Sequence, residues 1–358
     1  RTPVDVRTSL AYHERLSGRL HVPAMAGVGR DRPPDGYRSA VQVRDVADTS
    51  RAPVHVILNP TAGGGAAARA RRELEWELAR RGVDFSVRQT ERRGHAVELA
   101  RESALDGASA VIAAGGDGTI HEVANGLLKA AEEGVPMPAM GVLPIGTGND
   151  FAKLVDRSTS RDVAYGAVAG GRIRRVDAGL VSWDGESEFF VNAMGTGIDV
   201  EVVRQIERYP RLRGTIGYLL GLLRAVIGFR PVPLRVRADD LVIEEKVMIC
   251  AVGNSPCLGG GFHLFPGARP DDGLLDLCLI GEVKLREVPQ AIARILRGTH
   301  ASLPMVKLMK VRCVEIEAVH GDPLYFQLDG ELRFGSRLKI EARQHALPVL
   351  VRPDEEGE

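Results

Sequence analysis

Along residues 52–176, short apolar runs alternate with stretches in which apolar side chains recur at helical spacing. Residues 54–58 form a β-branched run that ends at an Asn-Pro pair, and residues 110–114 form a second buried-strand pattern. A further strand is expected at residues 83–88, and helices are expected at 66–81, 94–106 and 120–131. This order of strand, loop and helix predicts a parallel sheet covered by helices.

The pattern changes near residue 177, where strand-like apolar runs follow one another and turn residues separate most of them. The runs lie at residues 178–183, 188–193, 234–237, 241–252, 274–280, 311–318 and 325–328. A helical segment at about 213–229 interrupts them. We therefore predict a mostly antiparallel second domain, and we expect the last apolar stretch, 337–351, to return to the first domain.

Length and composition fit two globular domains. The chain has 358 residues, of which 44% are hydrophobic and 26% charged, and a domain usually takes about 100–200 residues. Residues 1–50 show no sustained periodicity and are predicted to be a loosely ordered or disordered extension, with a short amphipathic piece around residues 10–20. The expected division is 1–50 for the extension, 51–176 with about 338–352 for the α/β domain, and 177–337 for the β-rich domain.

Charge and cysteine content argue against several classes of protein. The formal net charge is zero, which does not indicate a nucleic-acid partner. The four cysteines form no Cys-x-x-Cys pair and fit no zinc-ligand spacing, so we interpret them as buried free thiols in a reducing compartment. The sequence has neither a signal-peptide pattern nor about 20 consecutive apolar residues. These features predict a cytoplasmic protein whose membrane contact is at most peripheral.

The segment Gly115-Gly116-Asp117-Gly118-Thr119 lies between a predicted buried strand and a predicted helix. Its glycines allow the backbone to approach phosphate oxygens, and the N-terminus of the following helix attracts an anion. Asp117 would repel phosphate directly, so it needs Mg²⁺, ordered water or a hydrogen bond to be useful there. The structural alternative is a tight strand-to-helix turn without a ligand.

Two more loops of this kind make the functional interpretation stronger. Residues 146–150 read Gly-Thr-Gly-Asn-Asp, where Asn149 or Asp150 could simply cap a helix. Residues 59–65 read Asn-Pro-Thr-Ala-Gly-Gly-Gly after the first strand. We call residues 59–65, 115–119 and 146–150 the first, second and third glycine loops. Together they predict a site for nucleotide phosphates, but they do not identify the acceptor.

Acidic residues near the end of the chain are less informative by themselves. Asp271-Asp272-Gly273 is a turn sequence. Asp329-Gly330 is a strong hairpin signal, and Glu331 places a second acid beside that turn.

The order of these motifs resembles the diacylglycerol kinase catalytic family, and it is most similar to the bacterial soluble lipid kinases. The resemblance runs from about residue 54 to 351 and adds Gly259-Gly260-Gly261 with Pro266-x-Ala268 to the glycine loops and the two acidic blocks. It implies a Rossmann-like (phosphofructokinase-like) α/β nucleotide domain and a C-terminal antiparallel β-sandwich. It also implies ATP as co-substrate, Mg²⁺, and phosphorylation of the hydroxyl of diacylglycerol or a related lipid.

The resemblance implies roles for the matched residues. Those expected to contact ATP are Asn59, Pro60, Thr61, Ala62, Gly63, Thr90, Gly116, Asp117, Gly118, Thr119, Ile120, His121, Glu122 and Thr147. The carboxylate of Asp272 and the backbone carbonyls of Arg269 and Leu274 would bind Mg²⁺, although Arg269 replaces a more usual apolar residue. Glu331 is the implied proton acceptor, Asp329 lies beside it, and Asp117 is the third candidate catalytic acid.

The sequence leaves the choice between Asp329 and Glu331 open. It predicts that the acids at 117, 272 and 329–331 converge with the glycine loops on one magnesium-triphosphate site.

Three alternatives accompany this interpretation. An NAD kinase shares the Gly-Gly-Asp-Gly motif, but the third glycine loop and the Asp272 block argue against it. A sphingoid-base or ceramide kinase belongs to the same superfamily. A non-catalytic lipid- or nucleotide-binding protein would not need the acids, so their presence argues against it. The oligomeric state stays open, with a homodimer as one form.

One segment suggests how a lipid could be reached. Residues 215–229 have a helical pattern with an apolar stripe of Ile216, Leu219, Leu220, Leu223, Val226 and Ile227. Around it lie Arg204, Arg208, Arg211, Arg213 and Arg230. We hypothesise that this region faces an anionic membrane, where basic residues strengthen binding. The alternative is an ordinary core helix with solvated arginines.

Overall fold

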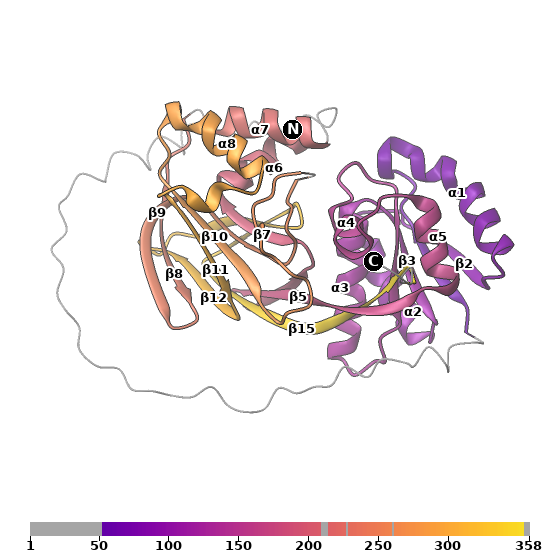
Figure 1. Ribbon diagram of the computed structural model, residues 1–358. Coiled ribbons are helices and arrows are strands. Elements are labelled where there is room, and N and C mark those ends of the chain that lie inside the picture. Colours follow the sequence, from indigo (N-terminus) through magenta and orange to yellow (C-terminus); the bar gives the residue numbers. More distant parts are fainter. Residues whose placement is uncertain (1–51, 209–213, 227, 260, 354–358) are drawn as a thin grey trace, which may run out of the picture. The chain divides into compact units, whose positions relative to one another are not determined.

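The computed structural model describes residues 52–353, except 209–213, 227 and 260 (Figure 1). The predicted extension at 1–50, with its amphipathic piece, lies outside the described residues. So do Arg211 and Arg213 of the hypothesised membrane-facing group.

The first half forms the predicted parallel sheet. Strands β1 (Val54–Leu58), β2 (Phe85–Gln89), β3 (Ala110–Gly115) and β4 (Ala139–Pro144) pair in the order β4-β3-β1-β2, all parallel. The helices are α1 (Ala62–Arg80), α2 (His95–Leu105), α3 (Asp117–Glu132), α4 (Asp150–Asp156) and α5 (Arg161–Gly170). The carboxyl ends of β1, β3 and β4 therefore lie side by side, and each of these strands leads into one glycine loop.

Side-chain alternation gives the sheet two buried faces. Val111 and Ala113 of β3 pack in a core with α2, α3 and α4, whereas Ala110 and Ile112 pack in a second core with α1 and α5. Successive residues of a strand point to opposite faces, so a continuous apolar run is what a sheet covered on both sides requires.

The second half is built of antiparallel strands, as predicted. They are β5 (Arg172–Trp183), β6 (Glu186–Phe190), β7 (Ala193–Gly197), β8 (Val232–Ala238), β9 (Leu241–Gly253), β10 (Leu275–Gly281), β11 (Val306–Val311), β12 (Cys313–Ala318), β13 (Leu324–Leu328), β14 (Glu331–Gly335) and β15 (Arg337–Val351). Many of them contribute side chains to one shared core. Strand β15 pairs with β12 and β5 and also reaches β4 at Val349–Met140.

Several elements differ from the sequence prediction. The run expected at 188–193 is split between β6 and β7, since the N–H groups of residues 191–193 bond to the Asp329 carboxylate. Strands β11 and β14 and the helices α6 (Ile198–Arg208) and α8 (Val288–Leu296) were not predicted. In α6 the β-branched residues Ile198, Val200, Val202 and Val203 obscure the helical pattern.

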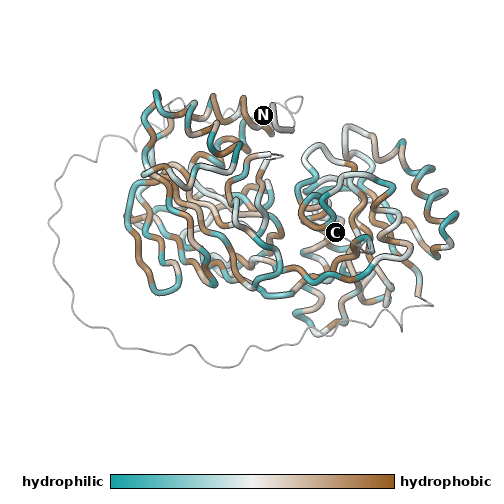
Figure 2. The backbone as a smooth tube through the Cα atoms, in the orientation of Figure 1, coloured by the Kyte–Doolittle hydropathy of each residue, from teal (hydrophilic) through white to brown (hydrophobic). Residues whose placement is uncertain are grey.

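The predicted helix at 213–229 is present as α7 (Gly214–Val226), but its predicted apolar stripe is wrong in part. Among the side chains of α7 that the structure describes, the buried hydrophobic ones are Leu222 and Ala225, whereas Leu220 and Leu223 are 39% and 43% exposed. Figure 2 shows that α7 is largely hydrophobic. Helices α6, α7 and α8 share an apolar core with strands β9, β10 and β11. None of the described helices is long and apolar enough to cross a membrane.

The four cysteines are free, as the sequence predicts. Cys250 and Cys278 are buried, but Cys257 and Cys313 are only partly buried, which corrects the expectation of four buried thiols.

Candidate active site

The three glycine loops touch one another at the carboxyl ends of their strands. The amide of Ile145, directly before the third loop, donates to the carbonyl of Gly115 at 2.8 Å and so holds the start of the third loop beside the second. The Nδ2 of Asn59 donates to the Oγ1 of Thr119 at 3.1 Å, which joins the first and second. The sequence prediction that these loops meet is therefore correct for all three.

Glycine is required where these loops approach most closely. A Cβ on Gly146 would lie 2.6 Å from the Cα of Gly116, and a Cβ on Gly63 would lie 2.6 Å from the carbonyl oxygen of Ile145. Gly63 also has φ of 59°, in the left-handed region that other residues rarely adopt. Larger residues would separate the loops, so the glycines are needed for the contact as well as for any approach of phosphate.

Asp117 works through hydrogen bonds, one of the three options that its sequence position left open. Its Oδ2 accepts from the amide of Asn149 at 2.8 Å, and its Oδ1 accepts from the amide of Asp150 at 2.9 Å. Burial, together with the charge of Asp150, raises the pKa of Asp117 to about 6 despite these bonds. The side chain therefore holds the third loop against the first turn of α3.

Glu122 holds another segment of the site. Its two oxygens accept from the amides of Gly94 and Ala96, at 2.9 and 3.1 Å. This fixes residues 90–96, which include Thr90, to the side of α3. Glu122 therefore has a structural role, because its negative carboxylate satisfies free N–H groups at the start of α2. Its expected ATP contact stays a prediction. Thr147, which is also expected to contact ATP, is exposed in the third loop.

His121 is buried between two carboxylates. Its Nδ1 lies 3.0 Å from Oδ2 of Asp329, and its Nε2 lies 2.8 Å from Oε1 of Glu188. Burial alone would lower the pKa of His121, but these two partners outweigh it and raise that pKa to about 9. Burial alone would also raise the pKa of Glu188, but the hydrogen bonds from His121 and Arg333 lower it to about 2. The imidazole is therefore a buried cation.

The carboxylate of Asp329 has four hydrogen-bond partners. Besides His121, it accepts from the amides of Val191, Asn192 and Ala193 at 2.9 to 3.0 Å, and its side chain is 0% exposed. This geometry suits a positioning residue, and the assignment of the base to Asp329 or Glu331 stays a prediction.

Glu331 has different surroundings from Asp329. Its side chain is 20% exposed, and the guanidinium of Arg93 contacts its carboxylate. The Oε1 of Glu331 lies 3.7 Å from the place where a Cβ on Gly118 would be, so the carboxylate faces the first turn of α3. Asp329 and Gly330 have φ of 48° and 92° and form the predicted two-residue hairpin that carries Glu331. Of the two acids, Glu331 is the one that can reach a ligand at the glycine loops.

Comparison with known proteins gives independent evidence. The diacylglycerol kinase catalytic domain family matches residues 53–181, and the YegS C-terminal NAD kinase β-sandwich-like domain matches residues 192–351. A relative from Chromohalobacter salexigens, described as "Probable lipid kinase YegS-like", is 34% identical over 279 residues, which cover 77% of this chain and 86% of the relative. The chain belongs to the diacylglycerol kinase family of lipid kinases.

Other similar proteins agree with this membership. A diacylglycerol kinase of Bacillus subtilis is 28% identical over 279 residues, covering 77% of this chain and 88% of that protein. A solved structure from Bacillus anthracis, described as a candidate diacylglycerol kinase, is similar with a TM-score of 0.70 at 25% identity, covering 84% of this chain and 97% of that one. The resemblance and the fold class predicted from sequence are confirmed, and the protein is a lipid kinase.

The acid expected to bind metal in this lipid kinase lies in a different group of contacts. Oδ2 of Asp272 lies 2.8 Å from Nζ of Lys310, which also contacts Asp276 at 3.1 Å, and Oδ1 accepts from the amide of Leu274 at 3.1 Å. Asp117 begins α3, Asp329 contacts His121 of α3 and Glu331 faces Gly118, whereas the contacts of Asp272 are with Lys310 and Leu274. The convergence of these acids on one magnesium-triphosphate site stays a prediction.

The surroundings of Asp272 fit Mg²⁺ only in part. Each carboxylate oxygen has a further lone pair beyond the bond that it accepts. However, no group of three or more His, Cys, Asp or Glu side chains within the described part of the chain could hold a metal ion. A cation at this place would depend on backbone carbonyls and water, and it would face the Lys310 ammonium.

Sequence reasoning missed several residues of this lipid kinase site: Arg93, Asn125, Glu188 and Arg333. A signal was available for one of them, since His121 and Asn125 are polar positions four residues apart on an otherwise apolar helix face. Asn125 bonds to both backbone groups of Phe189 at 2.9 Å and so pairs with β6. Phe189 lies in the other half of the chain, and no local pattern identifies it as the partner of Asn125.

Proposed function

We propose that this lipid kinase transfers the γ-phosphoryl group of ATP to the hydroxyl of diacylglycerol or a closely related lipid, giving phosphatidic acid or its analogue. The observation that carries the proposal is the position of Glu331, whose carboxylate faces the turn of α3 where the three glycine loops meet. In the division expected from sequence, residues 51–176 with about 338–352 would bind the nucleotide and residues 177–337 the lipid.

The reaction follows from this arrangement. Backbone N–H groups of the glycine loops and of the first turn of α3 would bind the phosphates, with Asn59, Thr61, Thr90, Thr119 and Thr147 as the polar side chains around them. The lipid hydroxyl attacks the γ-phosphorus, its proton goes to Glu331, and the bond between the γ-phosphorus and the bridging oxygen of ADP breaks. Because the transition state is loose, positioning contributes more than base strength.

Two groups would neutralise the negative charge of the phosphates, namely Mg²⁺ and the guanidinium of Arg93. Mg²⁺ bound with the triphosphate would neutralise its oxygens, and Asp272 with the carbonyls of Arg269 and Leu274 remains the proposed cation site. Arg93 contacts Glu331 and lies in the segment that Glu122 fixes to α3. Its guanidinium is placed to pair with Glu331 before phosphate enters and with phosphate afterwards.

The membrane supplies the lipid, so we propose that the enzyme acts as a peripheral protein at an anionic surface. Arg230 is exposed near α7, whereas Arg204 stacks on the ring of Tyr325 at 4.1 Å from its centroid. Arg230 is therefore available to lipid phosphates, and Arg204 has a structural partner.

The test is radiolabelled ATP with Mg²⁺ and a panel of diacylglycerol, a sphingoid base, ceramide and NAD. Label in phosphatidic acid supports the proposal. Label only in a sphingoid-base or ceramide phosphate would move the protein to that branch of the superfamily, and label only in NADP would overturn the lipid acceptor. Omission of Mg²⁺ should abolish transfer, whereas Asp272→Asn should raise the Mg²⁺ concentration required if Asp272 binds the ion.

A further inference from the structure

A buried polar contact between strand β13 and helix α6 adjoins the turn that carries Glu331. Oε1 of Gln327, on β13, accepts from the amide of Gly330 at 2.7 Å. Nε2 of the same side chain donates to Oδ2 of Asp199, near the start of α6, at 2.8 Å. Gln327 is 0% exposed and Asp199 is 3% exposed. We call these two residues the Gln327–Asp199 pair.

The partners of Gln327 fix the orientation of its amide group. The backbone N–H of Gly330 can only donate, so the atom that faces it is the side-chain oxygen. The amide nitrogen then faces the carboxylate of Asp199, which accepts. A glutamine suits this position because it carries a donor and an acceptor on one group. A glutamate would place a second carboxylate against Asp199.

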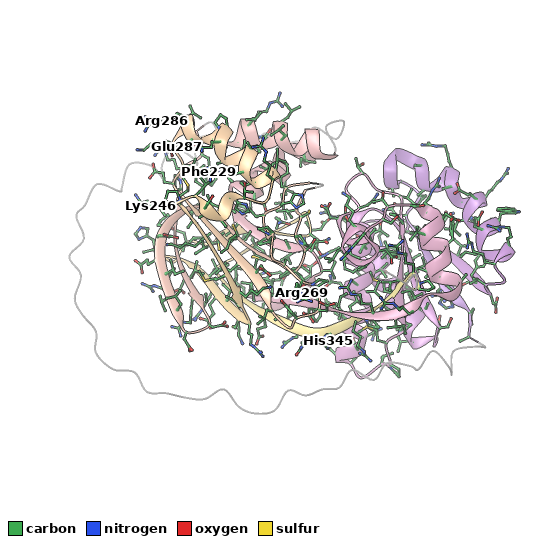
Figure 3. All side chains as sticks on the ribbon, in the orientation of Figure 1. Phe229, Lys246, Arg269, Arg286, Glu287 and His345 are labelled. Carbon is green, nitrogen blue, oxygen red and sulfur yellow. The ribbon has the colours of Figure 1, made fainter. Side chains whose placement is uncertain are left out.

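A glycine in the neighbouring strand leaves room for the pair. Gln327 lies in register with Gly195 of β7. A Cβ on Gly195 would overlap Oδ2 of Asp199 and would lie 3.2 Å from Nε2 of Gln327. Ile198 and Val202 of α6 pack in one core with residues of the sheet, and Figure 3 shows side chains filling the space between α6 and the sheet. A glycine within a strand often marks such a close approach.

The turn before Glu331 is attached at two points. The carboxylate of Asp329 accepts from the amides of residues 191–193, and Gln327 accepts from the amide of Gly330. Because Glu331 follows Gly330 directly, the direction in which its side chain leaves the turn depends on that peptide group. Gln327 therefore controls where the Glu331 carboxylate lies.

We propose that Gln327 is a positioning residue for phosphoryl transfer: held by Asp199, it fixes the turn and sets the distance of Glu331 from the first turn of α3. This inference rests on the proposed function, because it concerns the acid that receives the proton there. A misplacement of about 1 Å can cost about 10²-fold in rate. The amide of Gln327 should therefore matter for turnover although it touches no substrate.

The first test removes the amide and measures turnover with the acceptor that the natural protein phosphorylates. In Gln327→Leu the amide of Gly330 loses its acceptor, so kcat should fall by about 10²-fold. The KM for ATP should change by less than about twofold, because the glycine loops are unaltered. A natural kcat in Gln327→Leu would overturn the proposal.

Thr196→Val is the matched control. The hydroxyl of Thr196 donates to the carbonyl of Tyr325 at 2.7 Å, which is a hydrogen bond between the same two strands but away from the turn. This variant should lose stability and keep the natural kcat. An equal loss of kcat in Thr196→Val and Gln327→Leu would overturn the proposal, because both changes would then act through the stability of the sheet.

A double variant shows whether Gln327 acts through Glu331. Once the carboxylate is removed, its position no longer matters. The kcat of Glu331→Gln/Gln327→Leu should therefore lie within about twofold of the kcat of Glu331→Gln alone. A further drop of about 10²-fold in the double variant would overturn the proposal.

An exchange of donor and acceptor covers the case in which Gln327→Leu does not fold. Gln327→Glu places two carboxylates side by side, so the contact opens and kcat should fall by about 10²-fold. The addition of Asp199→Asn restores one donor and one acceptor at the natural net charge. The double variant should recover kcat by at least about tenfold, and a double variant no more active than Gln327→Glu would overturn the proposal.

Hydrogen exchange separates this proposal from the proposed function, because it needs neither ATP nor lipid. Mass spectrometry of the full-length protein should show the amide of Gly330 exchanging at least about tenfold faster in Gln327→Leu, and at the natural rate in Thr196→Val. Faster exchange supports the role of Gln327 even if no diacylglycerol is phosphorylated. Unchanged exchange in Gln327→Leu overturns it, even if the kinase is active.

Discussion

His121 and Asp329 lie 208 positions apart in the chain and are joined by a hydrogen bond of 3.0 Å between Nδ1 and Oδ2. This bond connects α3, which begins in the second glycine loop, with the turn before Glu331. Glu188 holds the other ring nitrogen, so the imidazolium lies between two carboxylates. The distance between the proposed phosphate site and the proposed base therefore depends on one buried charge network.

Replacement of His121 should destabilise the fold severely. His121→Asn leaves the carboxylates of Asp329 and Glu188 without their shared cation, and breaking a buried ion pair of this kind costs about 3–5 kcal/mol. Urea unfolding should show this loss in the free energy of unfolding. His320→Asn is the control, because His320 is exposed, and it should change that free energy by less than about 0.5 kcal/mol.

The same network predicts a pH dependence. The pKa of His121 is raised from 6.5 to about 9 in the folded protein, so the folded state binds the proton more tightly than the unfolded state. This contribution is complete below about pH 6.5 and is lost as the pH rises through about 9, a difference of about 3 kcal/mol. The free energy of unfolding, measured from pH 6 to 10, should fall over this window. A His121→Asn variant with the same slope would contradict this assignment.

The two acids of the Asp-Gly-Glu turn should respond differently to removal of their charge. Glu331→Gln should lower turnover by about 10²–10⁴-fold, the usual contribution of a general base, with little change in the thermal midpoint. Asp329→Asn should lower the midpoint, because its amide replaces one acceptor oxygen among four donors. Steady-state kinetics and thermal unfolding on both variants test this. Full activity in Glu331→Gln would remove it as the base.

Contact between the second and third glycine loops should control nucleotide binding. Gly146→Ala places a Cβ 2.6 Å from the Cα of Gly116, so the loops must separate, and we expect at least about a tenfold loss in affinity for a non-hydrolysable ATP analogue. Gly170→Ala is the control, since nothing lies within 4 Å of its Cβ position. Calorimetric titration of both variants should show the loss only in the first.

Charge reversal at Arg230 and Arg286 should weaken membrane binding. Arg230 and Arg286 are exposed, and each basic residue near an anionic surface contributes about 1 kcal/mol. The double variant Arg230→Glu/Arg286→Glu should therefore bind anionic vesicles at least about tenfold more weakly at low salt. Arg72→Glu, on the exposed side of α1, should bind as the natural protein does. The idea is refuted if the natural protein, the double variant and Arg72→Glu sediment equally with the vesicles.

Local sequence patterns were sufficient to predict the elements that depend on residues close together in the chain. The β-branched run of β1, the helical spacing of α1 and the Asp329-Gly330 hairpin each follow from short-range preferences and were predicted correctly. In contrast, α8 was missed, because it is short and its apolar positions pack against strands whose placement the sequence does not give.

The sequence by itself determined that three glycine loops end parallel strands and that acids follow in the order of a lipid kinase, because these features are written in residue type and spacing. Only the tertiary structure decided how differently the two acids of the Asp-Gly-Glu turn are surrounded. Asp329 and Glu331 are two positions apart and chemically similar, but one receives four hydrogen bonds inside the protein and the other faces α3 with 20% of its side chain exposed. The donors that distinguish them come from residues 121 and 191–193, and only folding brings those groups to the turn.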